Sequence, residues 1–387
     1  MAERLRLAAV LAQCLHPYRQ THRLNPRQWQ VCHHGLACRT EALGETRLEC
    51  ERCGEESRFY HACRDRHCPR CQRQATEAWC ERQGAHTLEV AYYHVVFTLP
   101  QAVNPWVELH PEVIYDQLLK SAWATLAAFA ADPKRLGGQL GATLVLHTWR
   151  QSLTRHLHVH CLVPGGVLTQ QGAWKPARSH YLFPVRALAR HFRGHFVGHL
   201  RARHQRGELS RVQGASALQR GLDALMQQDW VVYAKPCLQH TETVVAYLGR
   251  YSHRIALSDS RLIGFEDGQV QLRYKDYRDH DRNKVMTLSG EELIRRFLLH
   301  VLPKGFMRIR HCGFLANRCR QAKLAQVRQA IGQAACDAKE SEAAEAASPR
   351  YRCPQCGQPA LKVVAIVLPA RRLIPIKAPP RVAERAH

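Results

Sequence analysis

The chain has 387 residues, which fits two or three domains better than a single ordinary domain. Apolar residues make up 45% of the sequence, a proportion typical of globular proteins, so a disordered or collagen-like chain is excluded. Lysine and arginine number 56 against 32 aspartate and glutamate, which gives a formal net charge of +24. Such a charge indicates a polyanionic partner, most simply a nucleic acid.

The apolar runs are too short for a membrane protein. The longest, AWATLAAFAA at 122–131, falls well short of the roughly 20 residues that a membrane span needs. The first 20 residues predict an amphipathic helix and not a signal peptide, because polar residues follow the apolar patch at once and no small-residue cleavage site is present. We therefore expect an intracellular protein without membrane association, in a compartment where disulfides are rare.

Nine of the 16 cysteines lie in the first 80 residues, and eight of them fall between 32 and 80. In a reducing compartment such clustering indicates metal binding more than a disulfide framework. Two CxxC pairs stand out, Cys50/Cys53 and Cys68/Cys71, and together they supply four thiolates that can close a tetrahedral Zn²⁺ site. The alternative is four structural cysteines without a common ligand. Four nearby residues are candidate ligands of a possible second zinc site, and ordinary packing is their alternative role. These residues are Cys38, Cys63, His61 and His67.

The predicted elements suggest three consecutive parts: a cysteine-rich part at 1–85, a central part at 88–310 and a C-terminal part at 311–387. Strands alternate with helices in the central part, which argues for a sheet with helices packed against it, in the α/β or α+β class. The expected strands are 89–100, 141–149, 156–166 and 230–236, with a hairpin at 268–279 and 284–289. The expected helices are 112–131, 242–254 and 291–302, with a helix-rich stretch at 185–228.

The C-terminal part reads as a helical segment, one further CxxC pair (Cys353/Cys356) and a Pro/Arg-rich tail. From Pro369 onward the tail is basic and is expected to be disordered.

The run His156-Leu157-His158-Val159-His160 alternates imidazoles with apolar side chains. Successive side chains of a strand point to opposite faces, so the three histidines share one face and can hold a divalent metal ion. The alternative is a polar strand face that happens to be rich in histidine. Metallo-hydrolases use a related HxHxDH pattern, but no Asp-His pair follows here.

The predicted helix at 242–254 contains Tyr247 and Tyr251 on one helical face. Both phenols are therefore candidates for one active site, and core packing is the alternative role. Arg250 and Arg254 lie on the same segment, where they can contact a phosphate backbone.

Together these motifs resemble the rolling-circle transposases of the insertion sequence ninety-one family, which carry an N-terminal zinc-binding region. The matching stretches follow the family's order along most of the chain. They are CERCG (50–54), CRDRHCPRCQ (63–72), HVVFTLP (94–100), HTWRQSLTRHLHVHCLVPGG (147–166), VVAYLGRYSHRIALSDSRL (244–262), YKDYRD (274–279) and FLLHVLPKGFMRIRHCGFLANR (297–318). The sequence departs from the family at Leu157, where a proline is common, at His61, where asparagine is frequent, and at Cys312, where tyrosine is common.

The resemblance implies an α+β fold with an antiparallel-sheet HUH endonuclease core, in which two histidines flank one hydrophobic residue. That motif falls on His158 and His160, and the catalytic tyrosine pair falls on Tyr247 and Tyr251. The resemblance also implies a bacterial, nucleoid-associated enzyme that cleaves and rejoins single-stranded DNA through a 5′-phosphotyrosine link. Related nucleases take a glutamine or glutamate as a third ligand of Mg²⁺ or Mn²⁺, for which Gln151 is the candidate; its alternative is an ordinary turn glutamine.

The arginines of the cysteine-rich part suit phosphate contacts, so this part is expected to help bind DNA. The candidates named for this role are Arg64, Arg66 and Arg70. Two other functional classes stay open. One is a zinc-dependent DNA-binding protein without catalysis, and the other is a metallo-hydrolase of small molecules.

Overall fold

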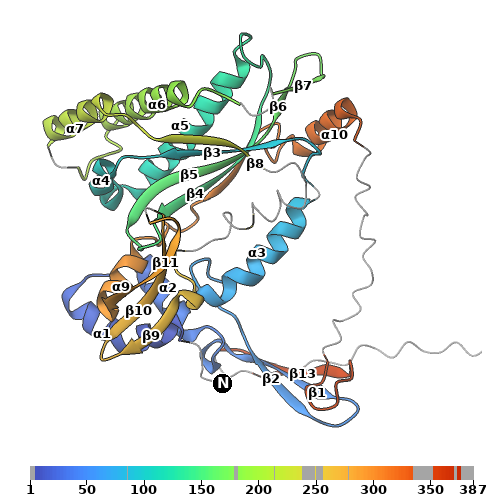
Figure 1. Cartoon of the computed structure of the whole chain (residues 1–387). Helices are drawn as coiled ribbons and strands as arrows, with labels where there is room; N and C mark the ends of the chain where they lie inside the picture. Colours follow the sequence, from blue (N-terminus) through green and yellow to red (C-terminus); the bar gives the residue numbers. More distant parts are fainter. Residues whose placement is uncertain are drawn as a thin grey trace, which may run out of the picture. The chain divides into compact units, whose positions relative to one another are not determined.

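The computed structural model describes residues 5–84, 86–177, 182–212, 214–237, 249, 256–277, 279–333, 352–369 and 373–375 (Figure 1). The chain divides into two compact units. The terminal unit combines residues 6–72 with the C-terminal residues from 337 onward, and the central unit contains residues 73–336. This division differs from three consecutive parts because the last strands of the chain join a sheet begun by the first ones.

In its described residues, the terminal unit contains two helices and one antiparallel sheet of order β14-β13-β1-β2. A capping box starts its second helix: the Asn25 side chain accepts the Gln28 backbone N–H, and the Gln28 side chain accepts the Asn25 N–H. The elements are α1 (Leu7–Thr21), α2 (Pro26–Ala37), the 3₁₀ turn η1 (Glu41–Leu43), β1 (Glu45–Cys50), β2 (Glu56–Tyr60), β13 (Leu361–Val367) and β14 (Leu373–Pro375).

Strand β14 corrects the expectation of a tail that is disordered from Pro369 onward. Leu373, Ile374 and Pro375 pair with β13, so part of the tail is ordered by the sheet. Residues 376–387 lie outside the described part of the chain.

The central unit is built on a five-stranded antiparallel sheet of order β12-β4-β5-β3-β8. Its strands are β3 (Tyr92–Thr98), β4 (Gly141–Trp149), β5 (Arg155–Pro164), β8 (Val232–Cys237) and β12 (Ile309–Gly313). The helices are α4 (Asn104–Leu109), α5 (Pro111–Ala131), α6 (Val185–Gln205), α7 (Ala215–Gln227), α9 (Gly290–Leu298) and α10 (Arg320–Ile331), while α3 (Pro69–Gly84) contains the sequence boundary between the units.

Smaller elements complete the central unit. A three-stranded sheet has the order β11-β10-β9, and a two-stranded sheet joins β6 to β7. Their bounds are β6 (Gly166–Leu168), β7 (Trp174–Pro176), β9 (Leu262–Glu266), β10 (Gln269–Asp276) and β11 (Arg282–Ser289), with 3₁₀ turns η2 (Gln101–Val103) and η3 (Asp259–Arg261).

One face of the five-stranded sheet forms the core. Side chains of β5 on that face, Leu157, Val159 and Cys161, are buried in one apolar cluster with residues of α5, α6 and α7. These helices lie together along this sheet (Figure 1). Phe192 and Phe196 of α6 are fully buried there and pack around Trp230. The histidines of β5 alternate with the core residues and therefore lie on the opposite face of the sheet.

The α+β class predicted from the sequence is confirmed, and most of the predicted elements are present. The predicted helix at 112–131 is α5, and the predicted strands at 141–149 and 156–166 are β4 and β5. The strands of the terminal sheet, the short strands β6 and β7, and strands β9 and β12 were not predicted. The predicted helix at 242–254 lies outside the described residues except for Gly249, which is helical. Across the described part of the chain, every helix is too short or too polar to cross a membrane.

Candidate functional site

Strand pairing gathers histidines from three strands on the face of the central sheet opposite the core. His147 of β4 lies directly opposite His158 of β5. On the other side of β5, His160 lies opposite Val96 of β3, and His94 is two residues further along β3. The ligand nitrogens of His147, His158 and His160 all lie within 4.8 Å of one another. Three imidazoles at such separations fit the donor set of one divalent metal ion.

Hydrogen bonds orient two of these rings. The Nδ1 atom of His158 lies 3.0 Å from the backbone oxygen of His156, and the Nδ1 atom of His160 lies 2.8 Å from the Nε2 atom of His94. A histidine whose Nδ1 is held in this way presents Nε2 to a metal ion. Metal-ligating histidines usually have a supporting hydrogen bond of this kind on their other ring nitrogen. His94 is thus a positioning residue that the sequence pattern did not single out.

Burial keeps the imidazoles in the form that binds metal. It lowers the pKa of His158 to about 3, with the neighbouring His156 adding to the effect. Burial likewise lowers the pKa of His94 and of His156 to about 4. At neutral pH these rings are therefore uncharged, and a metal ion would not have to displace a proton from them.

The histidines line a cavity of about 780 Å³. Its remaining wall comes from the end of β4 and the loop after it, and from the end of β10 and the residue that follows: Trp149, Arg150, Gln151, Ser152, Tyr274, Lys275, Asp276 and Tyr277. Gln151 therefore lies in the same cavity, but its side-chain amide donates to the Tyr277 hydroxyl at 3.3 Å. His147 lies with the two predicted histidines, so the structure offers an imidazole beside Gln151 as a candidate third ligand.

The predicted nucleophiles, Tyr247 and Tyr251, lie outside the described residues, as do Arg250 and Arg254. Gly249 between them is described and buried. A side chain at this position would collide with the Cys80 sulfur, so close packing explains the glycine.

The expected zinc site of Cys50, Cys53, Cys68 and Cys71 is wrong in its grouping. Cys68 and Cys71 lie instead with Cys38 and Cys63, and all four sulfurs are within 4.8 Å of one another. Cys50 and Cys53 lie beside Cys353 and Cys356. A CxxC spacing fixes which two thiolates act together, but strand pairing and helix packing decide which pairs meet.

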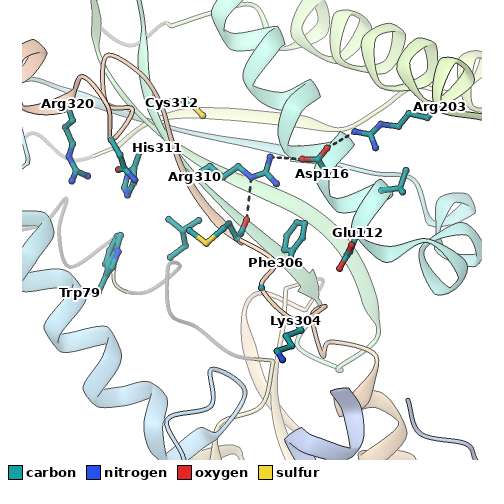
Figure 2. A pocket seen from close by; sticks show the side chains of 15 residues that line it. Trp79, Glu112, Asp116, Arg203, Lys304, Phe306, Arg310, His311, Cys312 and Arg320 are labelled. Carbon is teal, nitrogen blue, oxygen red and sulfur yellow. Dashed lines mark hydrogen bonds and ion pairs between the residues drawn. The ribbon is translucent and has the colours of Figure 1, made fainter. Parts of the chain in front are cut away.

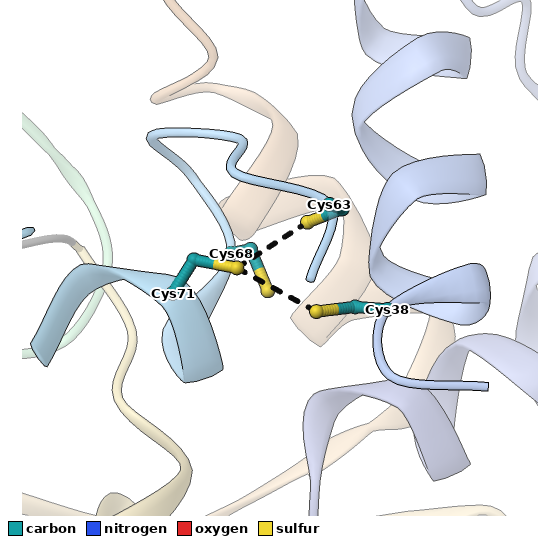
Figure 3. Close-up of side chains that lie close together, drawn as sticks. All are labelled: Cys38, Cys63, Cys68 and Cys71. Atoms are coloured by element: carbon teal, nitrogen blue, oxygen red, sulfur yellow. Dashed lines mark hydrogen bonds between the residues drawn. The ribbon is translucent and has the colours of Figure 1, made fainter. Parts of the chain in front are cut away.

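Figure 3 shows Cys38 at the end of α2, Cys63 in the loop between β2 and α3, and Cys68 and Cys71 where α3 begins. The Cys71 sulfur lies 3.6 Å from those of Cys38 and Cys63. That separation exceeds a disulfide bond of about 2.05 Å. It matches the roughly 3.8 Å between sulfurs bound tetrahedrally to Zn²⁺ at about 2.3 Å. The four cysteines thus fit a structural zinc ion.

The two histidines considered as further zinc ligands have other partners. His67 Nδ1 lies 3.0 Å from the Asp65 carboxylate, and His61 lies 3.0 Å from the Thr46 hydroxyl. Asp65 also pairs with Arg27 and His34. Burial alone would raise the pKa of Asp65, but the hydrogen bonds from His67 and His34 outweigh it and hold that pKa well below its usual range. Asp65 stays ionised and braces the loop between Cys63 and Cys68.

The three predicted DNA-contacting arginines beside this cluster differ in exposure. Arg64 is exposed, in a left-handed backbone conformation with φ 53°. Arg66 is half-buried, and Arg70 donates to the Cys38 backbone oxygen at 2.7 Å. Of the three, Arg64 is the most accessible to a phosphate.

A second cavity of about 1160 Å³ lies at the β12 edge of the central sheet (Figure 2). On one side of it, Asp116 pairs with Arg310 at 2.9 Å and with Arg203 at 2.6 Å. Lys304 and Arg320 also line this cavity, and within the described ranges no ion pair engages either of them. The aromatic ring of Phe306 also lines the cavity, beside Asp116 and Arg310 (Figure 2).

Comparison with known proteins identifies the class to which this fold and these sites belong. The family model described as "Transposase zinc-binding domain" matches residues 10–99, and the one described as "Putative transposase" matches residues 141–323. The first range contains the cysteine cluster of Figure 3, and the second contains the histidines of β4 and β5. No solved structure matches the chain.

Two relatives match most of the chain. The "Putative transposase y4qJ" of Sinorhizobium fredii (strain NBRC 101917 / NGR234) is 44% identical over 337 residues, which are 83% of this chain and 85% of the relative. The "Transposase for insertion sequence element IS801" of Pseudomonas savastanoi pv. phaseolicola is 32% identical over 311 residues, 77% of this chain and 73% of the relative. The chain belongs to the insertion sequence ninety-one family of transposases and has the family's N-terminal zinc-binding region.

The role of Asp65 beside the cysteine cluster can be tested by Asp65→Asn. The substitution removes a buried charge from Arg27, His34 and His67, at a cost of about 1–3 kcal/mol. We expect zinc to be released to a chromogenic chelator faster than from the wild type. Asp132→Asn, at a more exposed carboxylate paired with Arg135, is the matched control and should release zinc at the wild-type rate. Equal release from Asp65→Asn and wild type would contradict the bracing role.

Proposed function

We propose that this transposase nicks and rejoins single-stranded DNA at insertion-sequence ends through a 5′-phosphotyrosine intermediate. The observation that carries the proposal is the set of three imidazoles gathered on one open sheet face. The family match supports a transposase, and the net charge of +24 supports a polyanionic substrate.

His147, His158 and His160 would hold the divalent metal ion. When bound, that ion polarises the scissile phosphate and stabilises negative charge on the leaving oxygen. Imidazole ligands favour Mn²⁺ or a softer ion over Mg²⁺, whose preferred ligands are oxygens. Gln151 remains in reach of the same cavity, and we assign it to the bound DNA and not to the metal.

The chemistry is a transesterification that conserves the energy of the ester. The phenol oxygen of Tyr247 or Tyr251 attacks phosphorus, and the bond from phosphorus to the 3′ oxygen breaks. The 5′ phosphate becomes joined to tyrosine, and the 3′ oxygen leaves as a hydroxyl with a proton. Rejoining reverses these steps with a 3′ hydroxyl as the attacking group, so no ATP is consumed.

Two tyrosines allow strand exchange in one active site. The first holds the 5′ end of one cleaved strand while the second attacks another cleavage site. Their positions in sequence, four residues apart, suit presentation from one helical face. This assignment rests on the sequence match, because both residues lie outside the described part of the structure.

DNA contacts are assigned to two surfaces of the central unit. At the histidine cavity, Trp149 and Tyr277 offer aromatic rings, and the Tyr277 side chain is 63% exposed. Unpaired bases stack readily on such rings. At the β12 edge, Lys304 and Arg320 offer positive charge to phosphates. Arg64, Arg66, Arg70, Arg250 and Arg254 remain proposed DNA contacts.

The histidine assignment is tested by separate His147→Ala, His158→Ala and His160→Ala substitutions. Each should lower cleavage of a labelled single strand by about 100-fold or more, because each removes a metal ligand. DNA affinity should change little, since it arises from distributed positive charge. Mn²⁺ binding, followed by electron paramagnetic resonance, should weaken in parallel with cleavage. His156→Ala should have a smaller effect.

The control for these substitutions is His199→Ala, at an exposed histidine of α6 outside the cavity, which should cleave normally. An active His147→Ala variant together with an inactive Gln151→Ala variant would contradict the proposed third ligand and support Gln151. Full cleavage by His158→Ala would contradict a catalytic role for these histidines. Absence of cleavage by the wild type would leave a zinc-dependent DNA-binding protein without catalysis.

The tyrosine assignment is tested by Tyr247→Phe and Tyr251→Phe, alone and together. If both phenols are nucleophiles, each single change stops transposition in cells, and the double change abolishes every covalent protein–DNA adduct. Tyr277→Phe is the control, because it removes a phenol at the histidine cavity and should keep the adduct. Normal transposition by either single variant would establish an enzyme with one nucleophile.

The contribution of the β12 edge is tested by combining Lys304→Ala with Arg320→Ala. Loss of two phosphate contacts should reduce the slope of log affinity against log salt concentration by about 1.4 for single-stranded DNA. Cleavage at saturating DNA should be unchanged. Arg220→Ala, an exposed residue of α7, is the control for nonspecific loss of charge. An unchanged slope in the double variant would remove this cavity from the DNA path.

A further inference from the structure

The C-terminal CxxC pair has no part in the sites assigned so far. The Cys356 sulfur lies 3.7 Å from that of Cys50, and the Cys353 sulfur lies 3.6 Å from that of Cys53. All four sulfurs are within 4.8 Å of one another. These separations, like those in the first cluster, match thiolates bound tetrahedrally to one metal ion and exceed a disulfide bond.

The two CxxC pairs that meet here have the same local structure. Each is followed by a glycine in the left-handed region, Gly54 with φ 72° and Gly357 with φ 70°. Each glycine N–H donates at 2.9 Å to the backbone oxygen of the first cysteine of its pair. The first cysteine's own N–H donates to a residue two positions beyond its second cysteine, Glu55 in one turn and Gln358 in the other, at 2.9 and 2.8 Å. Two matching turns of this kind present four thiolates in a fixed arrangement.

Strand pairing brings the two turns together. Cys50 at the end of β1 lies opposite Leu361 at the start of β13. Beside this pair, the Glu51 N–H donates to the Ala360 backbone oxygen at 2.9 Å. The apolar support is small: Leu48 and Leu361 are the buried aliphatic residues that pack with Cys50 and Cys353. So small a core does not by itself stabilise a sheet, and small units of this kind depend on a metal.

We propose that Cys50, Cys53, Cys353 and Cys356 bind a second structural zinc ion, separate from the ion of the first cluster. This zinc site fastens the C-terminal strand pair to the N-terminal hairpin. It joins cysteines that are 300 residues apart in sequence, so the site is complete only after Cys356 has been synthesised. Four thiolates also suit iron, but zinc fits a site whose first two cysteines fall within the family's zinc-binding domain.

The test is metal analysis of the full-length chain, purified with reductant and without chelator. The wild type should contain two zinc ions, one for each cluster of four cysteines. The Cys353→Ser/Cys356→Ser variant should contain one, and so should Cys63→Ser, which alters the other cluster. Cys319→Ser is the control, because this cysteine belongs to neither cluster, and it should retain both ions.

A conservative variant guards against a simple folding failure. Cys356→His replaces a sulfur ligand of zinc with a nitrogen ligand. This variant should therefore retain the second ion that the serine variant loses. One zinc ion in the wild type, two in Cys353→Ser/Cys356→Ser, or iron in place of zinc would overturn the proposal. Because no step uses DNA, the result is independent of whether the protein cleaves single strands.

Discussion

The site of the central unit depends on the antiparallel register between β4 and β5. Along β5, Leu157, Val159 and Cys161 are buried against the helices, and the intervening histidines face the other way. A shift of one residue would place imidazoles in the core and apolar side chains in the cavity, so burial of the core face fixes the register. The same register sets His147 opposite His158. Packing on one face of the sheet thus gathers the histidines on the other.

The terminal unit is organised by another constraint. Its sheet has little apolar support around Cys50 and Cys353, and its loop between Cys63 and Cys68 is held by the charge of Asp65. At these two places, thiolate clusters and a buried ion pair supplement the apolar packing, which is otherwise concentrated in α1 and α2. A unit held in this way is expected to depend on the metal that its thiolates would bind. The exposed arginine beside the first cluster, Arg64, keeps a basic surface next to a rigid metal-stabilised loop.

The sequence was most informative where the decisive pattern is local. The alternation of His156 to His160 predicted the strand and its two faces, because a strand has a period of two residues. The helical spacing of apolar residues in 112–131 predicted α5 in the same way. The family resemblance, read from motifs spread along the chain, is confirmed by the comparisons.

What the sequence did not reveal depends on contacts between distant segments. His147 lies in a predicted strand, but its place beside His158 follows from pairing that a single strand does not encode. The grouping of cysteines failed for the same reason, since Cys353 is 300 residues from the thiolate it meets. One feature of the sequence could have indicated the observed grouping of cysteines. The two stretches CERCG and CPQCG share one pattern, and two like turns can complete one tetrahedral site.

The most direct test of the account is to locate the covalent link between protein and DNA. The Mn²⁺-loaded protein is incubated with a single-stranded insertion-sequence end, digested with protease and nuclease, and analysed by tandem mass spectrometry. The account predicts a nucleotide attached through its 5′ phosphate to Tyr247 or Tyr251, formed only when the divalent metal is present. A nucleotide attached to Tyr274 or Tyr277 of the cavity wall, or DNA cleaved by the metal-loaded protein with no tyrosine adduct, would contradict it.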